Sequence, residues 1–128
     1  MANTVTVTPL MNTDHRRIIT VYIAGDGTGE ETDTVVYDYS ADTNAGVLGK
    51  SRVRRIMWAN DAYDLQIDFA GATNYVVTHL NQNDNGDFKF DWMGGIPDLS
   101  ATPTGDVTIT TVGLGAGDHG WFMLELIK

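Results

Sequence analysis

The chain of 128 residues contains no cysteine, only three prolines and no long uninterrupted apolar run. The lack of cysteine excludes disulfide bonds and thiolate metal sites. The lack of a long apolar run leaves no segment that fits a membrane-spanning helix, so we expect no membrane partner. The N-terminal segment alternates threonine and valine and lacks the apolar centre of a signal peptide. We therefore expect a soluble protein made in the cytoplasm.

Positive charge is also scarce, with eight lysines and arginines against 17 acidic residues and a net charge of −9. Such a chain is repelled by phosphate groups, and we expect no direct binding of nucleic acid. Six of the eight basic residues nonetheless fall in two clusters, Arg16–Arg17 and residues 50–55. These clusters either pair with the chain's own carboxylates or meet an acidic partner, and the mixed charge of ordinary protein surfaces favours the first.

No segment shows a sustained helical period, whereas short alternating runs recur between turn residues every eight to twelve positions. This pattern predicts an all-β fold with a single domain over residues 1–128. We expect an antiparallel β-sandwich of jelly-roll type with about eight or nine strands, with a small barrel as the alternative. The predicted strands cover residues 3–8, 16–24, 33–39, 52–58, 63–69, 74–80, 87–92, 106–112 and 121–127.

Two connections are typical of hairpins. The Asn85–Gly86 pair favours a tight turn, and the glycine-rich segment 113–120 joins the last two predicted strands. Pro9 should end the first strand, since proline cannot donate to a neighbouring strand. Alternation assigns a further set of side chains to the core: Ile19, Val21, Ile23, Val107, Ile109, Phe122, Leu124 and Leu126.

Motifs for catalysis or cofactor binding are absent from the sequence. His15, His79 and His119 are far apart in the chain, and zinc needs three or four converging ligands. The glycine-rich segment 25–30 lacks the Lys-Ser/Thr ending of a phosphate loop, and no serine has the surroundings of a nucleophile. We therefore expect no enzyme activity, no cofactor and no metal.

Two loops are acidic enough to suggest calcium binding. The loop that begins at Asn81 starts like an EF-hand but has Trp92 where a bidentate glutamate is required. A second turn could gather several oxygens, although acidic turns are usually only solvated. Its carboxylates are Asp26, Glu30, Glu31 and Asp33.

The segment that best fits a protein interface combines arginines with a tryptophan, the residue types enriched at interface hot spots. We predict a partner-binding site at Arg52, Arg54, Arg55 and Trp58. The alternative is a core tryptophan with arginine side chains extended around it.

A series of short motifs runs along nearly the whole chain in a fixed order. The series comprises NTVTVT at residues 3–8, His15 before a strand that ends in GDGTGE, the segment from Thr32 to Asp38, Gly94–Gly95, the segment from Thr104 to Gly113, and a last strand that ends in Lys128. In this order the motifs resemble a group of small structural proteins of tailed bacteriophages.

The resemblance implies a virion component, most simply a capsid decoration or cement protein on the outside of the head. Its implied partners are the major capsid protein and further copies of itself as a homo-oligomer. A neck or tail-completion protein of the virion is an alternative. Another is a carbohydrate-binding β-sandwich module, in which exposed Trp and Tyr side chains stack on sugar.

Overall fold

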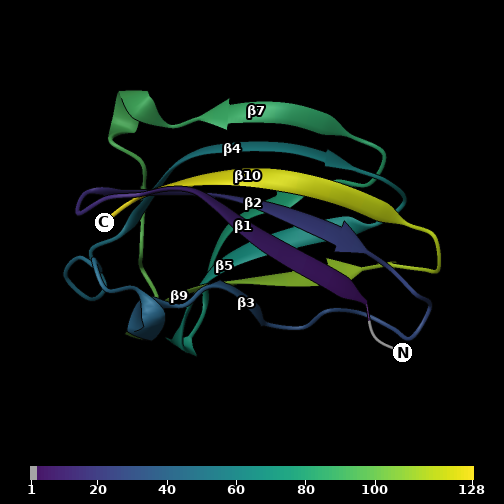
Figure 1. The fold of residues 1–128 in the computed structure, drawn as a ribbon, viewed down its shortest axis with the longest axis horizontal. Coiled ribbons are helices and arrows are strands. Elements are labelled where there is room, and N and C mark those ends of the chain that lie inside the picture. Colours follow the sequence, from purple (N-terminus) through teal and green to yellow (C-terminus); the bar gives the residue numbers. More distant parts are fainter. Residues whose placement is uncertain (1–2) are drawn as a thin grey trace.

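The structure is a computed structural model that describes residues 3–128. Ten strands form two antiparallel sheets packed around one core (Figure 1). The predicted all-β sandwich is thus confirmed, with one strand more than the upper expectation.

The large sheet has the strand order β1–β2–β10–β4–β7, and the short β8 pairs with β4 beside β7. Its strands are β1 (Thr4–Asn12), β2 (Arg16–Ala24), β4 (Arg52–Asn60), β7 (Asn85–Lys89), β8 (Ile96–Pro97) and β10 (His119–Ile127).

The small sheet has the order β3–β9–β5–β6. Its strands are β3 (Thr34–Tyr37), β5 (Asp64–Thr73), β6 (Tyr75–Leu80) and β9 (Ala101–Val112). Two single-turn 3-10 helices, η1 (Tyr39–Ala41) and η2 (Asp91–Met93), interrupt the connections. Within residues 3–128 no helix has the length and hydropathy needed to cross a bilayer.

The core lies between the sheets and follows the alternation of the strands. Large aromatic and branched side chains from both sheets are almost fully buried, as close packing of two inner faces requires. Every residue assigned to the core from the sequence is at most 1% exposed: Ile19, Val21, Ile23, Val107, Ile109, Phe122, Leu124 and Leu126.

The first strand runs further than predicted, because Pro9 does not end it. β1 is an edge strand, where a missing N–H costs little, and its pairing with β2 shifts register between Pro9 and Met11. Because the pairing resumes in a shifted register after Pro9, the strand continues to Asn12.

Neither predicted hairpin forms. Asn85 and Gly86 belong to β7 itself, and the loop before them crosses from the small sheet to the large one. The connection between β9 and β10 also passes from one sheet to the other. Leu114 explains this second crossing, since its side chain enters the core and its N–H donates to Glu30 Oε1 at 2.8 Å.

One ion pair lies inside the protein at the end of β10. Lys128 Nζ is 2.8 Å from Asp42 Oδ2, and the side chains are 0% and 1% exposed. The ammonium also donates to the Thr13 carbonyl at 2.8 Å, and the Tyr37 hydroxyl donates to Asp42 Oδ2 at 2.7 Å. These contacts connect Lys128 to β3, to the turn between β1 and β2, and to the loop after η1.

Candidate docking site on the large sheet

The outer face of the large sheet carries the candidate site. Along β10 the odd-numbered residues Trp121, Met123 and Glu125 are exposed or half-buried on this face, while the alternate residues are buried. Glu125 lies opposite Ile18 of β2 on one side and Arg55 of β4 on the other. The face therefore passes from an aromatic end at Trp121 to a charged end at Glu125.

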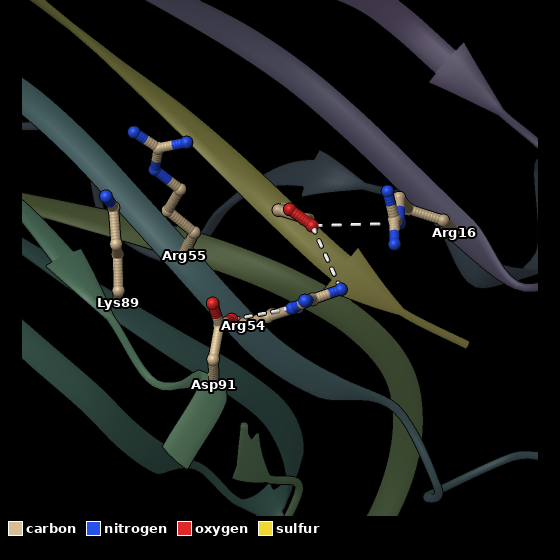
Figure 2. Close-up of a pocket in the computed structure, with 6 residues that line it drawn as sticks. Arg16, Arg54, Arg55, Lys89 and Asp91 are labelled. Atoms are coloured by element: carbon tan, nitrogen blue, oxygen red, sulfur yellow. Dashed lines mark hydrogen bonds and ion pairs between the residues drawn. The ribbon is translucent and has the colours of Figure 1, made fainter. Parts of the chain in front are cut away.

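A pocket at the charged end gathers side chains from β2, β4, β7, β10 and η2 (Figure 2). Four of them are cationic and two are carboxylates, although the whole chain is strongly acidic. The lining residues are Arg16, Arg54, Arg55, Lys89, Asp91 and Glu125.

An irregularity in β4 places two adjacent arginines in this pocket. Glu125 pairs with Arg55 and the next residue of β10 pairs with Val53, which leaves Arg54 as an extra residue. Such a bulge sets two residues opposite one and redirects their side chains. In a regular strand Arg54 and Arg55 would point to opposite faces, and one of them would enter the core.

Carboxylates of the same surface hold these arginines in place. Arg54 Nε donates to Asp91 Oδ1 at 2.6 Å. Arg55 binds Asp87 through two hydrogen bonds, 2.9 and 2.7 Å long, to its two oxygens. The hydrogen bond from Arg55 lowers the pKa of Asp87, and the bond to Asp91 raises the pKa of Arg54. Each shift favours the charged form, so Asp87 and Arg54 are held in their charged states.

Glu125 lies between Arg16 and Arg54 without a hydrogen bond. Its Oε2 is 3.7 Å from Arg16 Nε and 4.0 Å from Arg54 Nη1, and it finds no hydrogen-bond partner among residues 3–128. The terminal nitrogens of Arg54 are likewise not hydrogen-bonded within that range. A guanidinium has five N–H donors, so Arg54 retains donors for a carboxylate or phosphate from outside.

The structure divides the predicted partner-binding residues into three groups. Arg54 and Arg55 line the pocket. Arg52 is exposed at the start of β4 but is not part of the lining. Trp58 is in the core at 5% exposure and packs against Phe88 with ring centroids 4.6 Å apart. The prediction of Trp58 as an interface anchor is therefore corrected, because its ring faces the other sheet.

Sequence reasoning missed Arg16, Lys89, Asp91 and Glu125 as members of the site. They lie up to 109 positions apart and meet because β2, β10, β4 and β7 are neighbours. The sequence holds one local sign of the bulge. Val53 and Ile56 are apolar but three positions apart, which breaks the period of two, and both are fully buried in the structure.

The acidic turn from Asp26 to Asp33 does not bring its carboxylates together. Asp26 binds the hydroxyl of Thr28 at 2.5 Å, which lowers the pKa of Asp26, and Asp33 accepts from Asn74. Glu30 binds the backbone of the β9–β10 connection, and Glu31 binds Asn3 and Thr34. Across residues 3–128 no group of three or more His, Asp or Glu side chains is placed to hold a metal ion.

Comparisons with known proteins give no family. No protein-family model and no curated protein matches the chain. Among solved structures it is similar to a cupin domain from Bordetella pertussis Tohama I, with 8% identity, 100% of this chain and 97% of that chain covered, and a TM-score of 0.37. It is also similar to a cupin superfamily protein from Desulfitobacterium hafniense DCB-2, with 14% identity, 99% of this chain and 79% of that chain covered, and a TM-score of 0.36. A third similar structure is a mutant of a family 29 carbohydrate-binding module, with 13% identity, 98% of this chain and 79% of that chain covered, and a TM-score of 0.41.

These similarities concern the β-sandwich fold alone. The prediction that the chain is not an enzyme is corrected: the solved structures it is similar to include cupin-type proteins, and the exclusion of enzyme activity does not stand. No specific activity follows from the match. The matches above name no virion protein, so the virion assignment stays a prediction.

Proposed function

We propose that the chain is a structural protein of a tailed-bacteriophage virion that attaches to the outside of the capsid and stabilises contacts between major capsid subunits. The observation that carries the proposal is the basic pocket on the outer face of the large sheet. Its Arg54 and Arg55 are presented side by side by a bulge, on a chain whose net charge is −9. The ordered motifs of the sequence supply the virion context.

The pocket suits attachment to a broad surface. Arg54 is about one-third exposed and retains free N–H donors, so it can reach a carboxylate on a neighbouring subunit. Charged groups at an interface raise the association rate and select the partner's sign of charge. A protein that binds only the assembled shell adds its binding free energy to the stability of that shell.

Contacts between copies have a separate candidate region on β1. This strand is an edge of the large sheet, where backbone groups are free to pair, and it exposes Leu10 and Met11. A homo-oligomer around a capsomer would cover this edge.

The direct test is the location and copy number of the protein in purified particles, by immunogold labelling and quantitative mass spectrometry. Attachment to the head predicts labelling over the capsid and a copy number comparable to that of the major capsid protein. A copy number of about a dozen or fewer would instead indicate the neck or tail. Absence from the particles would contradict the proposal.

A further inference from the structure

A second pocket opens at the side of the sandwich where β1 and β3 form the edges of the two sheets. Its volume of about 250 Å³ is below the roughly 300–1,000 Å³ of sites for drug-sized ligands, so it suits a small molecule. Three of its lining residues, Arg17, Asp38 and Asp42, are ionisable. The remaining side chains form apolar walls: Val7, Val35, Val36 and Ala41.

Arg17 of β2 points to the inside of the sandwich. It has the same parity as the core residues Ile19 and Val21 on its own strand. Its cross-strand partner on β10 is Leu126, which is 1% exposed. The Cζ atom of Arg17 lies 5.6 Å from the centroid of the Tyr37 ring, which belongs to the opposite sheet. This cation–π contact holds the guanidinium between the two sheets.

The guanidinium of Arg17 has no acceptor in the part of the chain that the structure describes. Its Nε is buried without a hydrogen bond, and no carboxylate or carbonyl oxygen of residues 3–128 accepts from its terminal nitrogens. Only Nε is shielded from solvent in this way, so a ligand in the pocket can reach the terminal nitrogens. A carboxylate can accept two hydrogen bonds from a guanidinium at once. Arg17 therefore favours a ligand that carries a carboxylate.

The two acidic residues of the pocket differ in what they can still bind. Both oxygens of Asp42 accept hydrogen bonds from the protein, and the ammonium of Lys128 balances its charge. Asp38 uses only Oδ1, which accepts from the hydroxyl and the backbone N–H of Ser40 at 2.7 and 3.0 Å. The bond from the hydroxyl lowers the pKa of Asp38, which favours its charged form. Its Oδ2 has no hydrogen bond within residues 3–128 and is available for a cationic group.

We propose that this pocket binds a free amino acid with an apolar side chain. Arg17 and Asp38 line it with opposite charges, yet no ion pair joins them in the described chain. A ligand with both charges can satisfy both residues, because its carboxylate accepts from Arg17 and its ammonium donates to Asp38 Oδ2. The side chain of the ligand then packs against the valines of the walls, where burial favours apolar atoms. A ligand with a single charge leaves one of the two residues without a partner.

The test is calorimetric titration of the full chain with valine, leucine, isoleucine and methionine, followed by two analogues of the best ligand. One analogue is the deaminated acid, which lacks the ammonium, and the other is the decarboxylated amine, which lacks the carboxylate. We expect at least one amino acid to bind with a Kd of about 1 mM or below. Each analogue should bind at least about tenfold more weakly, because one charged residue of the pocket stays unpaired.

Two substitutions separate the halves of the site. Arg17→Met should weaken amino-acid binding at least about tenfold, whereas the control Arg52→Met, outside the pocket, should change it less than about twofold. Asp38→Asn keeps an oxygen for Ser40 but removes the charge that faces the ammonium. It should weaken binding of the amino acid and leave binding of the deaminated acid unchanged. Because Asp38 is exposed, this variant tests the site even where Arg17→Met fails to fold.

Three outcomes overturn the proposal. The first is that none of the four amino acids binds at about 10 mM. The second is that the deaminated acid binds as tightly as the amino acid, which would assign a site for simple anions. The third is wild-type affinity of the folded Asp38→Asn variant. The inference goes beyond capsid attachment and does not depend on it, because the titration uses the isolated chain and residues outside the basic pocket.

Discussion

Two sets of ion pairs in this protein have the same chemistry and opposite surroundings. Lys128 and Asp42 are almost completely buried, whereas Arg54 and Asp91 are 36% and 55% exposed at the basic pocket. Breaking a buried pair leaves an uncompensated charge away from water, while an exposed pair is screened by solvent. The buried pair therefore serves the stability of the fold, and the exposed pairs are free to exchange partners at the proposed docking surface.

The largest expected effect comes from removing the buried cation. Lys128→Met leaves Asp42 charged with only neutral hydrogen-bond donors, and we expect a loss of about 3–5 kcal/mol in the free energy of unfolding. Chemical denaturation followed by circular dichroism measures this. Lys89→Met, at an exposed position 3.9 Å from Asp87, should stay within about 0.5 kcal/mol of the wild type. Similar losses for the two variants would remove the distinction between the pairs.

The second effect is the pH dependence of the buried pair. Burial raises the pKa of Asp42, but hydrogen bonds from Lys128 and Tyr37 outweigh it and hold this pKa far below its ordinary value. A lowered pKa in the folded state gives stability that is complete above about pH 4 and is lost as the pH falls further. We expect the pair to contribute a loss on the order of 2 kcal/mol upon acidification.

The control for this effect is the double variant Lys128→Met/Asp42→Asn, which removes both charges. Urea unfolding at a series of pH values should show a steeper loss of stability in the wild type than in the double variant below about pH 4. Parallel curves would mean that Asp42 titrates normally in the folded state.

The smallest effect on stability is expected at the basic pocket. Arg54→Ser/Arg55→Ser removes two exposed pairs that each contribute between 0 and about 1 kcal/mol, so the free energy of unfolding should fall by about 2 kcal/mol or less. A loss above about 3 kcal/mol would show that these arginines support the fold.

Alternation along the strands carried much of the prediction. The buried faces of β2, β9 and β10 followed from a period of two. A strand that alternates apolar and polar residues has one apolar face, and only that face can be buried. The pairing of the strands did not follow, since a glycine-rich loop is compatible with a hairpin and with a crossing between sheets. Leu114 decides between them, and its burial depends on the opposite sheet.

The candidate site was predicted only in part for the same physical reason. Arg54 and Arg55 stand together in the sequence, so their cluster was visible. Their partners Arg16 and Lys89 join them only through the order of strands in the large sheet. Trp58 was misassigned because the bulge at Arg54 shifts the alternation of β4 by one residue and turns the ring into the core.

The most direct measurement is the occupancy of variant protein on purified capsid shells by co-sedimentation. Arg54→Ser/Arg55→Ser should lower the apparent affinity at least about tenfold, because it removes the donors that face a partner's carboxylates. Arg52→Ser is the matched control, since Arg52 lies on the same strand outside the pocket and should bind as the wild type does. Unchanged occupancy of the folded double variant would contradict the assignment of the basic pocket as the docking site.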